Sequence, residues 1–184
     1  MRVIAGRFGG RRLIAPKGRA TTRPTSERVR EALFSMLGTV EGEEVLDLFA
    51  GTGALGIEAL SRGARRAVFV EWDGGALDAL AMNLKALGLE SSEAEVRRGE
   101  ALDTLRGARI RSETYDLVLI DPPYRRAGAW GRELPAALEP LLAPKARVVV
   151  ESDRRVPLEL PWEIVKERRY GDTSITIHRY QWLQ

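Results

Sequence analysis

Apolar and polar residues alternate along residues 44–151 in blocks that predict strands and helices in turn. Short apolar runs predict strands at about 44–48, 67–71, 94–98, 115–120 and 146–151. Apolar residues at helical spacing between these runs predict helices at about 54–62, 74–87, 101–107 and 130–142. Strands that alternate with helices are typical of a parallel sheet covered by helices, so we assign the chain to the α/β class.

Further elements are predicted on either side of this core. Residues 25–38 predict an amphipathic helix with a hydroxyl side chain, Thr25 or Ser26, placed to cap its start. Strand-like runs at about 162–170 and 173–182, joined by a Gly-Asp turn, predict an antiparallel hairpin at the edge of the sheet. The expected sheet therefore has seven strands and is mostly parallel.

The N-terminal residues predict a basic extension of this core. Arg2–Ala5 and Arg11–Ala15 predict a short β-hairpin, and the polar residues Lys17–Pro24 predict a mobile loop. The first 30 residues hold nine Lys and Arg against one acid, although the whole chain has a net charge of only +3. Such an uneven distribution favours a polyanionic partner such as nucleic acid. We therefore expect a single domain, with the extension at residues 1–22 and the core at 23–184.

The composition excludes several kinds of site. The 184 residues include no cysteine, which rules out disulfides, thiolate metal sites and a cysteine nucleophile. The single histidine, His178, lies in an alternating, strand-like run, so we interpret it as structural and expect no metal. No apolar run reaches the roughly 18 residues of a membrane span, so we expect a cytoplasmic protein without a membrane partner.

The segment that begins at Asp47 combines a strand end, a glycine turn and the start of a helix, which is typical of a nucleotide-binding loop. Gly51, Gly53 and Gly56 satisfy the dinucleotide spacing, and Glu71 lies where such folds place a ribose-binding acid. Spacing alone therefore leaves the ligand open. Asp47 favours S-adenosylmethionine, because a carboxylate beside the turn would repel a pyrophosphate but attract the ammonium and sulfonium groups of that cofactor.

A second loop is expected at the same edge of the sheet. In an open parallel sheet, ligands bind outside the carboxyl ends of the strands, where the strand order reverses. Asp47–Gly53, after the first core strand, and Asp121–Tyr124, after the fourth, should therefore share a cleft. Glu100 and Ala101 follow the third strand and would flank an adenine. The residues expected to contact the cofactor are Asp47, Phe49, Ala50, Gly51, Gly53, Glu71, Glu100, Ala101 and Asp121.

The predicted catalytic loop consists of Asp121, Pro122, Pro123 and Tyr124. An exocyclic amine of a base is a poor nucleophile, because its lone pair is delocalised into the ring. An enzyme that methylates it must accept hydrogen bonds from its N–H groups, and the Asp121 carboxylate and the Pro122 carbonyl can supply both acceptors. Pro123 stiffens the loop, and Tyr124 offers a ring on which a flipped-out base can stack.

These residues carry a family resemblance that covers nearly the whole chain. Asp47–Gly53 resembles motif I, and Asp121–Tyr124 resembles motif IV, of class I S-adenosylmethionine-dependent amino-methyltransferases. Arg2–Gly6, Arg11–Leu13 and Arg23–Phe34 are similar to the bacterial RsmD-type family, which methylates the N2 amine of one guanine in 16S ribosomal RNA. The resemblance implies a Rossmann-like class I fold, S-adenosyl-L-methionine as cofactor and S-adenosyl-L-homocysteine as its product.

The partner that the resemblance implies is 16S ribosomal RNA or the assembling small ribosomal subunit. An aspartate or asparagine opens motif IV in that family, so Asp121 fits, whereas the residues past about 152 match no motif of it. We take a monomer as the default oligomeric state. The residues expected to contact RNA are Arg2, Arg7, Arg11, Arg12, Arg23, Thr25, Arg28 and Arg125.

Other functions account for only part of the sequence. An adenine-N6 DNA or RNA methyltransferase would use a similar catalytic loop, but no span is left for a domain that reads DNA sequence. A methyltransferase of protein side-chain amides would leave the basic extension unexplained. A nicotinamide-dependent oxidoreductase would use the glycine spacing, but Asp47 argues against it. A non-catalytic RNA-binding domain would not need a complete cofactor cleft.

Overall fold

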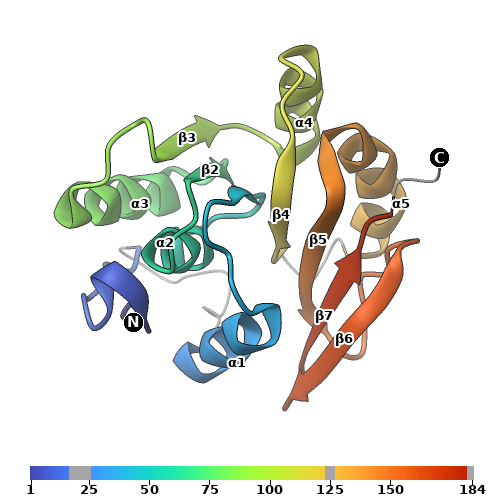
Figure 1. The fold of residues 1–184 in the computed structure, drawn as a ribbon, viewed down its shortest axis with the longest axis horizontal. Coiled ribbons are helices and arrows are strands. Elements are labelled where there is room, and N and C mark those ends of the chain that lie inside the picture. Colours follow the sequence, from blue (N-terminus) through green and yellow to red (C-terminus); the bar gives the residue numbers. More distant parts are fainter. Residues whose placement is uncertain (17–25, 123–126, 182–184) are drawn as a thin grey trace.

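The computed structural model describes residues 1–16, 26–122 and 127–181, and it shows a seven-stranded sheet with helices on both faces (Figure 1). The strands are β1 (Glu44–Asp47), β2 (Arg66–Glu71), β3 (Ala94–Arg98), β4 (Tyr115–Ile120), β5 (Leu142–Asp153), β6 (Glu163–Tyr170) and β7 (Thr173–Arg179). The helices are α1 (Glu27–Leu37), α2 (Ala54–Ser61), α3 (Gly74–Leu87), α4 (Ala101–Ile110) and α5 (Ala127–Leu138), with short 3-10 helices η1 (Gly6–Phe8) and η3 (Glu139–Leu141).

The strand order is β3-β2-β1-β4-β5-β7-β6, so β3 and β6 form the two edges of the sheet. Strands β1 to β5 run parallel, and β7 is antiparallel to its neighbours β5 and β6. This arrangement confirms the predicted α/β class, the mostly parallel sheet and the C-terminal hairpin. The strand order reverses between β1 and β4, which makes their carboxyl ends the expected position of a ligand.

Hydrophobic side chains form a separate core layer on each face of the sheet. On one face, α1, α2 and α3 cover strand residues that include Leu117 and Leu119 of β4. On the other face, α4 and α5 cover Val118 and Ile120 of the same strand. Strand β4 is therefore buried on both faces, which is why its sequence is a nearly unbroken apolar run.

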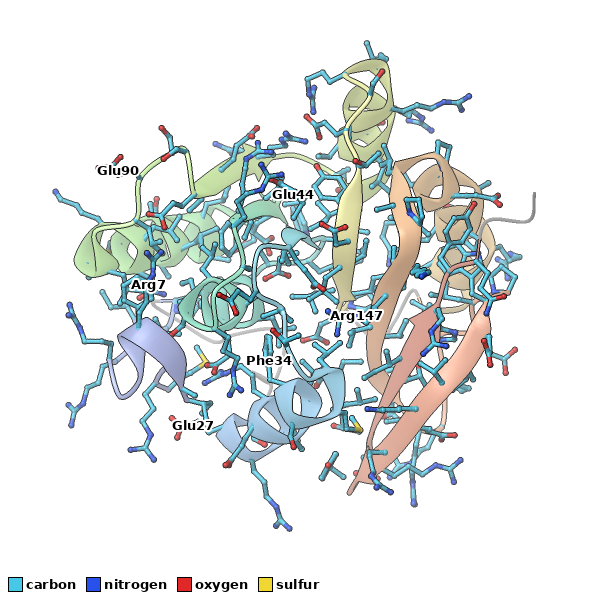
Figure 2. The ribbon with its side chains drawn as sticks, in the orientation of Figure 1. Arg7, Glu27, Phe34, Glu44, Glu90 and Arg147 are labelled. Carbon is cyan, nitrogen blue, oxygen red and sulfur yellow. The ribbon has the colours of Figure 1, made fainter. Side chains whose placement is uncertain are left out.

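Helix α1 begins and ends close to the predicted positions. The Ser26 hydroxyl accepts a hydrogen bond from the Val29 amide at 3.3 Å and so caps the helix. Gly38 follows the last turn with a φ of 77°, a conformation that glycine adopts at little cost. At this end, Arg147 of β5 donates a hydrogen bond to the Leu37 carbonyl at 2.6 Å, which fastens the helix to the sheet (Figure 2).

Among the described residues, the two N-terminal strands that the sequence predicts do not form. The segment folds back on itself through an antiparallel bridge between Arg2 and Arg12, with η1 at the bend. The Val3 amide donates to the Arg11 carbonyl, and the Leu13 amide donates to the Met1 carbonyl, each at 2.9 Å. The amides of Ile4 and Ala5 donate to the carboxylate of Glu58 in α2, at 2.7 and 3.1 Å. The two arms therefore pair through a single bridge without forming regular strands, and the predicted hairpin is not confirmed.

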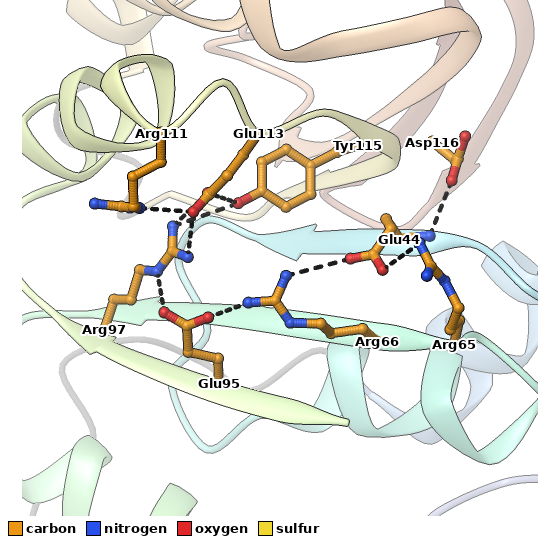
Figure 3. A network of polar contacts seen from close by, with 9 residues as sticks. All are labelled: Glu44, Arg65, Arg66, Glu95, Arg97, Arg111, Glu113, Tyr115 and Asp116. Atoms are coloured by element: carbon orange, nitrogen blue, oxygen red, sulfur yellow. Dashed lines mark hydrogen bonds and ion pairs between the residues drawn. The ribbon is translucent and has the colours of Figure 1, made fainter. Parts of the chain in front are cut away.

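Charged side chains connect four strands in the half of the sheet that contains β3 (Figure 3). Glu44 of β1 pairs with Arg66 of β2 at 3.5 Å, and Arg66 also pairs with Glu95 of β3. Arg97 of β3 then pairs at 2.7 Å with Glu113, just before β4. Burial alone would raise the pKa of Glu113, but hydrogen bonds from two arginines and a tyrosine lower it to about 2. Glu113 therefore stays ionised, and the network links the strands through their side chains.

His178 has the structural role that the sequence predicts. It is buried in β7, and its ring nitrogens lie 3.0 Å from the Trp162 carbonyl and 3.1 Å from the Thr176 hydroxyl. Burial lowers its pKa, which favours the neutral ring. Within the described residues, no group of three or more acidic or histidine side chains is placed to hold a metal ion. No helix among those residues is long and apolar enough to cross a bilayer.

Candidate cofactor and catalytic site

The glycine turn after β1 and the loop after β4 leave the sheet from adjacent strands. Asp47, the last residue of β1, is the register partner of Leu119 in β4, and Asp121 follows two residues later. Because β1 and β4 run parallel, both loops begin at the same edge, at the point where the strand order reverses. The described parts of the two loops therefore lie together where the sequence predicts the cleft.

The glycine turn is shaped by close packing. Gly51 and Gly53 have φ values of 54° and 82°, in the left-handed region that disfavours other residues. A Cβ at Gly53 would stand 2.4 Å from Cδ1 of Leu80, and one at Gly56 would stand 2.4 Å from Cε1 of Phe69. The glycines thus allow α2 to pack tightly beside β2 and α3. Because this packing requires glycine at Gly53 and Gly56 whatever the ligand is, the spacing of the glycines cannot by itself identify the cofactor.

Asp47 is a buried carboxyl group at the base of the turn. It is only 1% exposed, and its Oδ2 accepts a hydrogen bond from the Gly56 amide at 2.9 Å. Burial raises the pKa of Asp47 to about 7, the hydrogen bond from Gly56 opposes this rise, and the negative charge of Glu71 adds to it. A cation beside Asp47 would stabilise its ionised form. Binding of a cationic ligand near neutral pH would therefore shift Asp47 towards its ionised form.

Glu71 holds the end of β2 against the glycine turn. Its Oε2 accepts a hydrogen bond from the Gly51 amide at 2.8 Å, and its Oε1 accepts from the amides of Trp72 and Asp73, each at 2.8 Å. Three backbone donors thus fix the carboxylate in place. Oε2 can still accept a hydrogen bond from a ribose hydroxyl, because only one of its two lone pairs is used by the Gly51 amide. The ribose contact at Glu71 stays a prediction.

An aromatic contact joins the glycine turn to the helix that follows the catalytic loop. The rings of Phe49 and Trp130, the latter in α5, meet edge to face with centroids 5.2 Å apart. Ala50, beside Phe49, is buried. After β3, Glu100 is exposed at the start of α4, and Ala101 is buried. The contacts of these residues with a cofactor stay predictions.

The described part of the predicted catalytic loop consists of Asp121, which is partly buried, and Pro122, which is buried. Strand β4 ends at Ile120, in keeping with the inability of proline to donate to a strand ladder. Pro123 and Tyr124 lie outside the described residues, as does the predicted RNA contact Arg125.

The basic N-terminal residues are docked on the helices. Arg2 and Arg7 form ion pairs with acidic side chains of α1 and of the loop before β3, and Arg7 points towards α3 (Figure 2). Arg11 donates a hydrogen bond to a carbonyl near the end of α3, at 2.8 Å. Arg12 and Arg28 are exposed. The predicted loop Lys17–Pro24 and the predicted RNA contacts Arg23 and Thr25 lie outside the described residues.

Two buried polar side chains near the site are absent from the sequence-based predictions. Glu58 of α2 and Asn83 of α3 are 0% and 1% exposed. Glu58 accepts hydrogen bonds from the N-terminal segment, and Asn83 contacts both that segment and the Thr52 carbonyl of the glycine turn. Their positions in the sequence could have indicated that they are buried, because each interrupts an apolar stretch. Asn83 lies on the same helical stripe as Leu80 and Leu84.

Comparisons with known proteins agree with the geometry. The model of a family described as "Conserved hypothetical protein 95" matches residues 1–179. The "Putative rRNA methyltransferase YlbH" of Bacillus subtilis is 39% identical, over 97% of this chain and 98% of its own. The "Ribosomal RNA small subunit methyltransferase D" of Haemophilus influenzae is 35% identical, over 97% and 93%. The solved structure of the "Putative methyltransferase yhhF" from Escherichia coli has a TM-score of 0.83 at 34% identity, with 98% of each chain covered.

Proposed function

This chain belongs to the family described as Conserved hypothetical protein 95, and on that premise we propose that it is an S-adenosylmethionine-dependent methyltransferase of small-subunit (16S) ribosomal RNA. The methyl group goes to the exocyclic N2 amine of a guanine, and S-adenosylhomocysteine is the second product. Relatives named for small-subunit ribosomal RNA support this proposal, because they align with the N-terminal segment as well as with the cofactor-binding core. With ribosomal RNA as substrate, we place the enzyme in the cytoplasm.

The observation that carries the proposal is the position of Asp47 and Asp121 at the ends of adjacent parallel strands. Asp47 is buried beside the glycine turn, where its carboxyl group disfavours a pyrophosphate and favours a cationic cofactor. Asp121 begins the neighbouring loop, so a base that enters from that side meets the cofactor at the switch point. A nicotinamide-dependent oxidoreductase is not favoured, because it has no use for this second acid.

The residues of the site divide the work of methyl transfer between them. S-adenosylmethionine, when bound, supplies an electrophilic methyl group. Asp47 stabilises positive charge on the cofactor, and Glu71 holds the glycine turn in its binding conformation. The Asp121 carboxylate and the Pro122 carbonyl accept hydrogen bonds from the guanine amine, which orients its lone pair and stabilises the positive charge that develops on nitrogen.

Transfer of a labelled methyl group tests this function directly. With labelled S-adenosylmethionine, the enzyme should methylate the N2 amine of a guanine in an unmodified 16S ribosomal RNA transcript or in unmodified small subunits. Digestion to nucleosides followed by mass spectrometry identifies the product. Label on adenine N6, or binding of NAD in place of S-adenosylmethionine, would contradict the proposal.

Neutralising the basic N-terminal segment should weaken RNA binding, because fewer arginines are left to pair with phosphates. Replacing Arg7, Arg11 and Arg12 by Gln should lower RNA affinity and reduce its salt dependence by about one ion for each phosphate that is no longer neutralised. Affinity for S-adenosylmethionine without RNA should not change. Arg169→Gln is the matched control, because the Arg169 side chain is 69% exposed and also ion-paired but lies in β6, the edge strand at the other end of the strand order from β3. A salt slope identical to that of the control would show that the segment does not bind phosphates.

A further inference from the structure

The N-terminal segment, residues 1–16, is hydrogen-bonded to α2, which follows the glycine turn, and to α3, which follows Glu71 at the end of β2. In α2, the carboxylate of Glu58 accepts hydrogen bonds from two amides of the segment, and the hydroxyl of Ser61 accepts a hydrogen bond from the Phe8 amide at 3.0 Å. Gly6 lies so close to α2 that a Cβ there would stand 1.7 Å from the carbonyl oxygen of Ser61. The segment is therefore docked against the cofactor-binding half of the sheet.

One side chain joins this segment to the glycine turn. Oδ1 of Asn83 accepts a hydrogen bond from the Ile14 amide at 2.7 Å, and Nδ2 donates to the Ile14 carbonyl at 3.1 Å and to the Thr52 carbonyl at 3.0 Å. These partners fix the orientation of the side-chain amide, because only its oxygen can accept from the Ile14 N–H. Asn83 is 1% exposed, so the three hydrogen bonds are shielded from water.

The hydrogen bond from Asn83 to Thr52 lies at the part of the glycine turn where the backbone adopts left-handed φ values. Thr52 lies between Gly51 and Gly53, which both have left-handed φ values. Leu80, one helical turn before Asn83, occupies the place that a Cβ at Gly53 would need. Helix α3 therefore supports this turn through an apolar contact and a hydrogen bond. A displacement of Ile14 would disturb the same amide that holds Thr52.

We propose that Asn83 is a positioning residue that couples RNA binding at the N-terminal segment to S-adenosylmethionine binding at the glycine turn. The proposal rests on the proposed function, because it requires RNA at one end and the cofactor at the other. A ligand that orders either the segment or the turn also orders the shared amide, so the second ligand has less structure to order when it binds. The coupling is reciprocal, and each ligand tightens the binding of the other by the same factor.

Calorimetry with S-adenosylhomocysteine, which prevents turnover, measures this factor with and without RNA. The RNA is an unmodified 16S ribosomal RNA transcript and, in a second series, unmodified small subunits. In the wild-type protein, RNA should tighten binding of S-adenosylhomocysteine by about fivefold or more, the lower end of typical coupling. Asn83→Asp keeps the acceptor for the Ile14 amide but removes both donors, and it should reduce the factor to about twofold or less. Asn83→Ala removes all three hydrogen bonds and provides a second variant if the buried aspartate prevents folding.

Ser61→Ala is the matched control, because it removes two hydrogen bonds of the N-terminal segment, from the Phe8 amide and to the Ala5 carbonyl, that do not involve the glycine turn. It should keep the wild-type coupling factor even where RNA binds more weakly. Wild-type coupling in folded Asn83 variants would overturn the inference and leave the proposed function intact. Loss of coupling in Ser61→Ala to the same extent would assign it to docking of the segment in general, not to Asn83. A wild-type protein that binds neither ligand would refute the proposed function itself.

Discussion

Asp121→Ala should lower the rate of methyl transfer by about a hundredfold or more, with affinities for cofactor and RNA within a few-fold of wild type. The carboxylate lies one residue beyond β4 and is proposed to accept hydrogen bonds from the amine. These hydrogen bonds strengthen as the nitrogen develops positive charge, so they stabilise the transition state more than the bound substrate. Single-turnover transfer from labelled cofactor, with separate binding titrations, measures the two effects independently.

Asp121→Asn is the matched variant for this experiment, because it keeps one hydrogen-bond acceptor and should retain more activity than Asp121→Ala.

Tyr124 is predicted to stack on the flipped-out base, so Tyr124→Ala should weaken capture of the base by roughly 1–3 kcal/mol, because the stacking ring is removed. Tyr124→Phe keeps the ring and should keep most of the activity. If Tyr124→Phe were as inactive as Tyr124→Ala while Asp121→Ala stayed active, the hydroxyl and not the carboxylate would be the chemical group.

Asp47→Asn should stabilise the cofactor-free protein above pH 7 and weaken cofactor binding by about tenfold or more. The pKa of Asp47 is raised from 3.8 to about 7 in the folded protein, so the unfolded chain ionises this group first and stability falls as the pH rises from about 4 to about 7. At about 1.4 kcal/mol per pH unit, the full loss is on the order of 4 kcal/mol. Asparagine does not ionise, so the variant avoids this loss.

Urea unfolding at pH 5 and pH 8 measures the difference between Asp47→Asn and the wild type. The advantage of the variant should be larger at pH 8 and should shrink when S-adenosylmethionine saturates the wild type, because the cationic cofactor stabilises the ionised carboxylate. Calorimetry should show that cofactor affinity of the wild type rises between pH 5 and pH 7. A pH-independent difference in stability, together with unchanged cofactor affinity, would remove Asp47 from the binding site.

The sequence was sufficient to predict the sheet because its signals are local. Strand β4 is buried on both faces and therefore reads as an apolar run, and the turn at Gly51 and Gly53 needs left-handed backbone that glycine supplies. The sequence left the cap of α1 open between Thr25 and Ser26, and the hydrogen bond from the Val29 amide identifies Ser26 as a cap. The N-terminal hairpin was not confirmed, because its two arms pair through a single bridge only, and two of its amides bind Glu58, more than 50 residues away along the chain.

The candidate site shows the same limit. The position of Asp47 at a strand end follows from the sequence, but its raised pKa depends on burial by the folded core and on the charge of Glu71. The role of Asn83 depends on hydrogen bonds with Ile14 and Thr52, which lie 69 and 31 residues away. An asparagine in an apolar helical stripe marks a buried polar group, but the pattern contains no information about its partners.

The two outer strands of the sheet also bear on whether one molecule can join another. Within the described part of the chain, β3 and β6 each have one neighbouring strand, so their outer backbone groups face away from the sheet. A long apolar edge of this kind would recruit a strand from a second molecule. Both strands instead carry several charged side chains, namely Glu95, Arg97 and Arg98 in β3, and Glu163, Lys166, Glu167, Arg168 and Arg169 in β6. Pairing two copies along either edge would crowd these charges and strip them of water, so the sheet resists edge-to-edge aggregation.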